Sequence, residues 1–140
     1  MSLTLGAVAD DFTGATDLAG MLAAGGMRTM LVLGEPRPGD AAPDAEAVVV
    51  AMKTRTIPPA EAVAQSLSAW AWLKASGARQ AYFKYCSTFD STEKGNIGPV
   101  AEALWRETGE GPVVFVPSFP ENGRTVYRGH LFVFDQLLSD

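Results

Sequence analysis

Short runs of apolar residues alternate along the chain with longer stretches in which apolar residues recur every three or four positions. The runs predict β-strands buried on both faces, since such strands are continuously apolar. The predicted strands are residues 3–9, 29–33, 47–52, 80–85 and 113–116. The predicted helices run from Thr13 to Gly25, from Pro58 to Gly77 and from Pro99 to Arg106. This alternation predicts an α/β fold: three α/β/α layers around a mainly parallel sheet, in one domain of residues 1–140.

The ends of these elements carry typical start and stop residues. Thr13 is expected to cap the first helix, because its hydroxyl can accept a backbone N–H. The pair Pro58-Pro59 suits the first turn of the second helix. Beyond the fifth strand, residues 126–134 predict a short hairpin, with His130 in its turn and without a catalytic role. Gln136–Leu138 is expected to begin a further helix that the chain does not finish.

Composition narrows the class of protein. The 140 residues are 47% hydrophobic and carry a net charge of −5, from 11 Lys and Arg against 16 Asp and Glu. This balance argues against a nucleic-acid surface, which needs clustered cations. No apolar run approaches the roughly 20 residues of a membrane span, and no signal peptide is evident. The single cysteine, Cys86, is expected to be a small buried residue, and a cytoplasmic protein is expected.

Polar segments follow four of the predicted strands, where the ligands of open parallel sheets bind. The segments are Asp10–Gly14, Lys53–Thr56, Cys86–Ser91 and Ser118–Arg124. Because the carboxyl ends of parallel strands lie along one edge, these residues are expected to converge there. They would offer carboxylates, cations, hydroxyls and an amide to a small polyhydroxy anion.

Each candidate also has a purely structural interpretation. Asp10 and Asp11 could be helix caps favoured by the helix dipole, and Arg55 could belong to a surface salt bridge. Lys84 could extend its head to water from an edge strand, although a buried position would need an anionic partner. The hydroxyls of residues 87, 88 and 91 could satisfy loop backbone groups. Asn96 could cap the third helix or, with the N–H groups there, hold an anion.

Several familiar motifs are absent. No G-x-x-x-x-G-K-[ST] phosphate loop occurs, and no G-x-G-x-x-G follows the first strand, which disfavours a dinucleotide-dependent oxidoreductase. The D-x-D-x-T pattern of haloacid-dehalogenase-like phosphatases is matched only by Asp11 and Thr13. Ala9 stands at the position of the nucleophile, so that chemistry is excluded. No Cys/His cluster indicates zinc, and no metal ligands are expected in this chain.

Three segments together resemble the signatures of the four-carbon acid sugar kinase family. They are Val8–Asp17, Phe83–Thr92 with the following Gly95–Gly98, and Pro117–Thr125. The matches occur in order and extend over nearly the whole chain, so they are far more specific together than singly. The second segment is most similar to the 3-oxo-tetronate kinase branch.

The resemblance implies that two domains bind the two substrates separately. An N-terminal domain binds the sugar acid, and a separate C-terminal domain binds ATP. The reaction transfers the γ-phosphoryl group to a terminal hydroxyl of 3-oxo-tetronate, threonate or erythronate, with Mg²⁺ held largely by the C-terminal half. This chain would be the N-terminal, sugar-acid-binding domain, incomplete at its end, and is expected to be inactive alone. Self-association into a homo-oligomer is a further expectation.

The resemblance also suggests roles for particular residues. Asp10 and Asp11 are the candidate catalytic residues, one of them acting as base toward the attacking hydroxyl. The candidate substrate-binding residues are Thr13, Arg55, Lys84, Ser87, Asp90, Ser91, Asn96, Asn122 and Arg124. Lys53 departs from the family pattern, since many members carry an aspartate there. The alternative is a non-catalytic module that binds small anions or serves in assembly.

Overall fold

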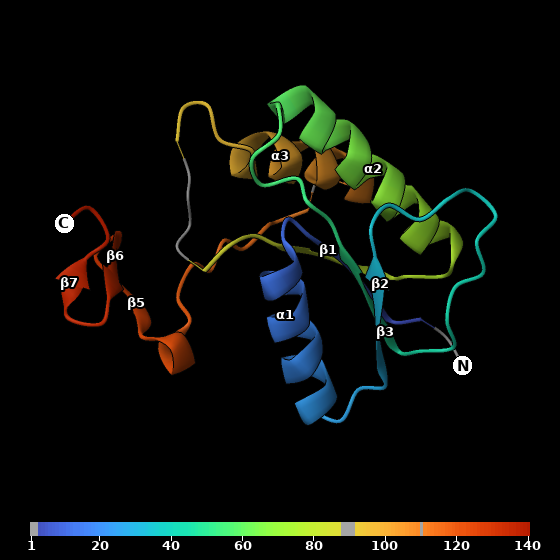
Figure 1. Cartoon of the computed structure of the whole chain (residues 1–140), viewed down its shortest axis with the longest axis horizontal. Helices are drawn as coiled ribbons and strands as arrows, with labels where there is room; N and C mark the ends of the chain where they lie inside the picture. The colour runs from blue at the N-terminus through green and yellow to red at the C-terminus, as the bar shows by residue number, and fades with distance from the viewer. Residues whose placement is uncertain (1–2, 88–91, 110) are drawn as a thin grey trace.

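A four-stranded parallel sheet forms the centre of the computed structural model, which describes residues 3–87, 92–109 and 111–140 (Figure 1). The strand order is β2-β3-β1-β4, and every neighbouring pair is parallel. The strands are β1 (Leu5–Ala9), β2 (Thr29–Leu33), β3 (Ala47–Ala51) and β4 (Gln80–Lys84). All four were predicted from their apolar runs, and their parallel pairing confirms the predicted class of sheet.

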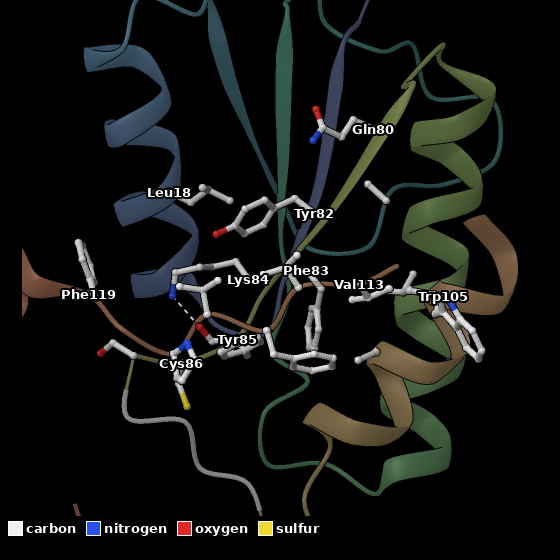
Figure 2. A pocket seen from close by; sticks show the side chains of 18 of the residues that line it. Leu18, Gln80, Tyr82, Phe83, Lys84, Tyr85, Cys86, Trp105, Val113 and Phe119 are labelled. Carbon is white, nitrogen blue, oxygen red and sulfur yellow. Dashed lines mark hydrogen bonds between the residues drawn. The ribbon is translucent and has the colours of Figure 1, made fainter. Parts of the chain in front are cut away.

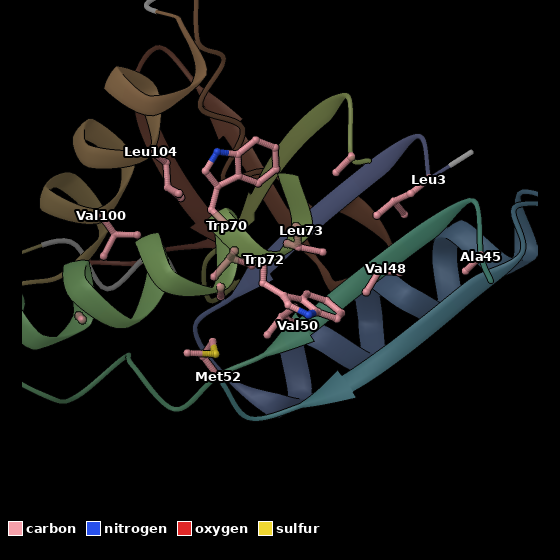
Figure 3. Close-up of a cluster of buried hydrophobic side chains, with 14 residues drawn as sticks. Leu3, Ala45, Val48, Val50, Met52, Trp70, Trp72, Leu73, Val100 and Leu104 are labelled. Atoms are coloured by element: carbon pink, nitrogen blue, oxygen red, sulfur yellow. The ribbon is translucent and has the colours of Figure 1, made fainter. Parts of the chain in front are cut away.

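Helices cover both faces of this sheet. The helices are α1 (Phe12–Ala24), α2 (Pro59–Ala75) and α3 (Ile97–Thr108). The core under α1 joins Ala15 and Leu18 to alternate residues of β1 and β3. The opposite core holds Trp70, Leu73 and Val100 of α2 and α3 over the other residues of those strands (Figure 3). The predicted three-layer arrangement is therefore confirmed.

The two central strands are buried completely. Val48, Val49 and Val50 of β3 have no exposed surface, and burying each side chain stabilises the fold by roughly 2 kcal/mol. β-Branched residues suit such positions because they pack well against neighbours on a pleated surface. The side-chain alternation sends Val49 to the α1 face and the other two valines to the α2 face.

Helix α1 begins one residue earlier than expected and has a different cap. The side chain of Asp11, not that of Thr13, accepts the N–H of Gly14 at 2.8 Å, and Thr13 lies exposed in the first turn. The carboxylate is the better acceptor here, since its charge also interacts favourably with the helix dipole. Helix α3 likewise begins earlier than predicted, at Ile97.

The C-terminal part forms a small antiparallel meander, β5-β6-β7. Its strands are β5 (Arg124–Tyr127), β6 (His130–Val133) and β7 (Gln136–Leu137), preceded by a 3₁₀ turn at Pro120–Asn122. Arg128 and Gly129 both have positive φ, as a two-residue type I′ hairpin turn requires. The predicted hairpin is confirmed, but His130 begins β6 instead of lying in the turn. The prediction of a helix from Gln136 was wrong, because that segment pairs with β6.

The predicted fifth strand, residues 113–116, does not form. Its four side chains are exposed, Val114 to 81%, and the segment pairs with no strand among the described residues. It is held instead by side chains: the Phe115 ring stacks on the Tyr85 ring with centroids 6.3 Å apart. An apolar run predicts that a segment can be buried in a sheet, but a ladder also needs an adjoining strand in register. Within the described ranges, no helix combines the length and the hydropathy needed to cross a membrane.

Candidate functional site

The carboxyl end of β1 lies where the connections leave the sheet in opposite directions. After β1 the chain passes to α1 on one face, whereas after β3 and β4 it passes to α2 and α3 on the other (Figure 1). Ligands of open parallel sheets bind at such a point. In the register of the sheet, Ala9 stands between Ala51 and Lys84, so the polar residues that follow all three strands are neighbours.

Asp10 joins these strand ends through its backbone. Its N–H donates to the carbonyl of Lys84 at 3.0 Å, and its own carbonyl accepts the N–H groups of Thr54 and Arg55 at 3.0 and 3.2 Å. The loop after β3 is therefore anchored directly on β1. This anchoring brings Arg55 close enough for its charge to act on the Asp10 carboxyl group.

The side chain of Asp10 is buried with one oxygen unsatisfied. Only 4% of the residue is exposed, and Oδ1 has no hydrogen-bond partner among the described residues. Burial, and after it the charge of the adjacent Asp11 carboxylate, raise the pKa of Asp10 from 3.8 to about 6. The charges of Lys84 and Arg55 and the backbone N–H of Cys86 act in the opposite direction. A buried, unpaired carboxylate oxygen is costly, and such groups are concentrated at functional sites.

Lys84 extends toward the start of α1 (Figure 2). Its Nζ donates to the carbonyl of Tyr85 at 2.6 Å. A Cβ on Gly14 would lie 3.3 Å from this Nζ and 2.6 Å from Asp11 Oδ1, so only glycine fits between them without displacing a side chain. An ammonium beside a helix N-terminus is electrostatically unfavourable unless anions compensate it. Two positive features side by side favour a negatively charged group such as a carboxylate or phosphate.

Asn96 supports the neighbouring loop. It occupies the N-cap position of α3, but its side chain makes no capping bond. Its amide nitrogen donates instead to the carbonyls of Thr54 at 2.5 Å, Ile57 at 2.9 Å and Arg55 at 3.3 Å. The capping interpretation was therefore wrong. The N–H groups of Asn96 are occupied by the backbone, which leaves only its Oδ1 for a substrate.

The structure describes the positions of some of the other predicted residues. Ser87 is half-buried just beyond β4, and Thr13 is exposed on the first turn of α1. Lys53 lies over the ring of Phe12, 5.0 Å from its centroid. Asp90 and Ser91 lie outside the described residues, so their predicted roles stay predictions.

Asn122 and Arg124 do not follow directly on a strand of the parallel sheet. They belong to the 3₁₀ turn and the start of β5, and Arg124 Nη1 donates to the carbonyl of Asn122. In Figure 1 the meander that follows them stands apart from the parallel sheet. Their placement at the rim of the same cleft was expected from the parallel fifth strand that does not form.

The site that the structure assembles thus contains Asp10, Asp11, Arg55 and Lys84, with Gly14 giving close approach. Sequence reasoning overlooked Gly14, although a glycine in the first turn of a helix is itself a signal, since it disfavours helix formation. In the described part of the chain, no three His, Cys, Asp or Glu residues gather as metal ligands. Cys86, the single cysteine of the sequence, is buried, as predicted.

An open parallel sheet with a buried carboxyl group and two cationic side chains at its carboxyl edge is typical of α/β domains that bind small molecules. The family model described as the sugar-binding N-terminal domain matches residues 5–140, and the chain belongs to this family.

Curated relatives share this stretch of sequence. A protein of Burkholderia multivorans named 3-oxo-tetronate kinase is 63% identical over 136 residues, covering 97% of this chain and 32% of its own length. An Escherichia coli K12 protein of the same name is 51% identical over 138 residues, covering 99% of this chain and 35% of its own length. The chain spans about a third of the length of these relatives.

Solved structures share the backbone as well. A Haemophilus influenzae protein is 50% identical with a TM-score of 0.91, over 96% of this chain and 32% of that one. A Bordetella bronchiseptica protein is 31% identical with a TM-score of 0.86, over 99% of this chain and 35% of that one. It was solved as a domain-swapped dimer with bound citrate. This similarity extends over nearly the whole chain, the C-terminal meander included.

Proposed function

We propose that this chain is the sugar-acid-binding part of an ATP-dependent kinase that phosphorylates 3-oxo-tetronate. The observation that carries the proposal is the buried Asp10 carboxyl group, with its unpaired Oδ1, beside two cations at the edge of the sheet where ligands bind. The relatives named 3-oxo-tetronate kinase support the choice of acid, since they are 51–63% identical to this chain.

The carboxylate of the acid would be bound between Lys84 and Arg55. Lys84 would act as a point charge beside the N-terminus of α1, and Arg55 as a bidentate donor from the loop above. The hydroxyl and oxo groups would contact Asp10, Thr13 and Ser87, together with Asp90 and Ser91. The citrate of the Bordetella relative supports this chemistry, because citrate is also a hydroxy carboxylate.

Asp10 is the better candidate for the general base. Asp11 already accepts the N–H of Gly14 as a helix cap, whereas Asp10 Oδ1 has no partner among the described residues. A pKa of about 6 leaves Asp10 mostly ionised at pH 7 and still basic enough to accept a proton. Asp10 would orient the terminal hydroxyl of the acid and take up its proton as the phosphoryl group is transferred.

The described residues do not fit a nucleotide site. They include no cluster of three metal ligands, and the sequence contains no phosphate-binding glycine loop. We therefore assign ATP and Mg²⁺ to the two thirds of the relatives' length that this chain does not span. When bound there, ATP supplies the phosphoryl group. We also propose a cytoplasmic location, in keeping with a lone, buried cysteine.

The experiment is an NMR titration of the ¹⁵N-labelled chain with 3-oxo-tetronate, D-threonate and D-erythronate. We expect the amides of Asp11, Gly14, Arg55 and Cys86 to shift, and Asp10→Asn to abolish these shifts. Asp44→Asn, on an exposed loop, is the matched control. We expect no ADP release when ATP and Mg²⁺ are added. Shifts confined to other residues would refute the binding site, and turnover by this chain would refute the assignment of the nucleotide.

Self-association is a second proposal, favoured by the exposed apolar side chains of the β5–β7 meander. Tyr127 is 63% exposed and Phe134 is 73% exposed, and such patches mark contact surfaces. The Bordetella relative is a domain-swapped dimer. Sedimentation velocity should detect dimers whose fraction rises with concentration and falls in a Tyr127→Ser/Phe134→Ser variant. A strict monomer at high concentration would contradict this proposal.

A further inference from the structure

Strand β4 ends the sheet with part of its backbone facing outward. Gln80 N–H donates to the carbonyl of Thr4, and the Lys84 carbonyl accepts the N–H of Asp10, so the even-numbered residues face β1. Because backbone groups alternate along a strand, the N–H and C=O groups of Ala81 and Phe83 point away from β1. β4 pairs with no second strand among the described residues.

A groove of about 690 Å³ runs along this outer edge. Leu18 and Met21 of α1 line one side and Leu104 and Trp105 of α3 line the other, and residues 112–119 line the groove as well (Figure 2). Both helical layers therefore extend past the last strand of the sheet. The groove therefore lies between the two helical layers and is bordered by the last strand of the described sheet.

The dimensions and surface of the groove fit an additional strand. With about 4.8 Å between strands, about 10 Å between layers and about 3.3 Å per residue, a strand residue occupies roughly 160 Å³. The groove thus has room for about four residues. Tyr82 faces it on the α1 side and is 44% exposed. Since both walls carry apolar side chains, the occupant must be apolar on both faces, as internal strands are.

We propose that this groove receives an extended apolar strand that pairs with Ala81 and Phe83 of β4. The occupant is a segment from the two thirds of the relatives' length that lies outside the match with this chain. The Haemophilus structure supports this occupant, because it keeps the same backbone over 96% of this chain, within a polypeptide about three times as long. Residues 113–116 do not fill the groove, since residues 112–119 themselves line it and do not pair with β4. The inference goes beyond the sugar-acid site and does not depend on it.

The test uses synthetic 15-residue peptides that tile the unmatched part of the Burkholderia multivorans relative. Each peptide is added to the ¹⁵N-labelled 140-residue chain, and amide shifts and hydrogen exchange are followed by NMR. In the chain alone, the amides of Ala81 and Phe83 should exchange rapidly while those of Tyr82 and Lys84 are protected. One peptide, or an overlapping pair, should shift Ala81 and Phe83 and slow their exchange.

Ala81→Pro tests the pairing itself. Proline at this position removes an outward N–H and leaves the hydrogen bonds to β1 intact, since those come from the even-numbered residues. The affinity of the peptide should fall about tenfold or more, and Ala81→Ser, which keeps the N–H, should bind normally. Continued protection of Tyr82 and Lys84 in the proline variant shows that the sheet is intact.

Four outcomes would overturn the proposal. The first is that no peptide shifts the amides of Ala81 and Phe83 at millimolar concentration, and the second is that both amides are protected from exchange in the dilute chain alone. The third is protection that depends only on the concentration of the chain, and the fourth is an unchanged affinity of Ala81→Pro for the peptide. The second would identify residues 113–116 as the occupant, and the third a second copy. Sugar-acid binding by Ala81→Pro should be normal in every case, which separates this test from that of the proposed function.

Discussion

The buried carboxyl group of Asp10 should reduce the stability of the fold at neutral pH. Its pKa is raised from 3.8 to about 6, chiefly because burial disfavours the charged form. The folded chain therefore binds a proton more tightly than the unfolded chain between these two values. The contribution of Asp10 to stability is greatest below pH 4 and is lost as the pH rises through 6.

The size of this effect follows from the shift. A rise of about two pKa units corresponds to about 3 kcal/mol, at 1.36 kcal/mol per unit. Solvent screening should reduce this free energy little, because only 4% of the residue is exposed. Asp10→Asn replaces the carboxylate with a neutral group of the same shape, so at pH 7 it should raise the free energy of unfolding by up to about 3 kcal/mol. A new, unpaired amide N–H₂ would reduce this gain by about 1 kcal/mol.

Urea denaturation of the chain and of Asp10→Asn, followed by tryptophan fluorescence from pH 3.5 to 8, measures this difference. The gain should be absent near pH 4 and complete above pH 7. Asp44→Asn on the exposed loop should show no comparable dependence on pH. A gain of the same size at pH 4 and pH 7, or a loss of stability at pH 7, would refute the argument that ionisation of Asp10 is costly. The variant should also lose affinity for the sugar acid, which is the mark of a functional group that is kept despite its cost.

Three further substitutions and one control test the rest of the site. Gly14→Ala should lower the affinity for the sugar acid about tenfold by displacing the Lys84 ammonium. Its stability should be nearly unchanged, because loss of the Asp11 helix cap offsets the gain of about 1 kcal/mol that alanine gives in a helix. Gly20→Ala in the same helix meets no atom within 4 Å and should keep affinity while gaining stability; equal affinity in both variants would remove Gly14 from the site. Asn96→Ala leaves three backbone carbonyls without their donor and should cost about 2 kcal/mol in urea denaturation, and a smaller loss than about 0.5 kcal/mol would contradict its positioning role. Arg55→Ala should weaken binding of the acid about tenfold to a hundredfold in calorimetry. Its stability should change little, since the side chain is exposed. Unchanged affinity would show that Arg55 does not bind substrate.

Local sequence predicted most of the α/β architecture. The valine-rich run at 47–51 and the run at 5–9 became the two buried central strands, and the helical stretches between strands became the two covering layers. The reason is physical: a parallel strand covered on both faces must be apolar throughout, so burial is visible in the residues themselves. The convergence of Asp10, Arg55 and Lys84 was also predictable, because parallel strands end at the same edge of a sheet.

The tertiary structure alone decided which polar groups have partners. Asn96 was predicted either to cap α3 or to help hold an anion. It stands at the N-cap, yet its side-chain amide bonds a loop some 40 positions earlier in the chain, which no local pattern indicates. The raised pKa of Asp10 likewise depends on what surrounds it. Residues 113–116 are as apolar as the central strands and remain exposed, although β4, which lines the same groove, has no second partner strand among the described residues. A sequence pattern specifies which side chains prefer to be buried, but only the arrangement of the whole chain determines whether another segment is there to bury them.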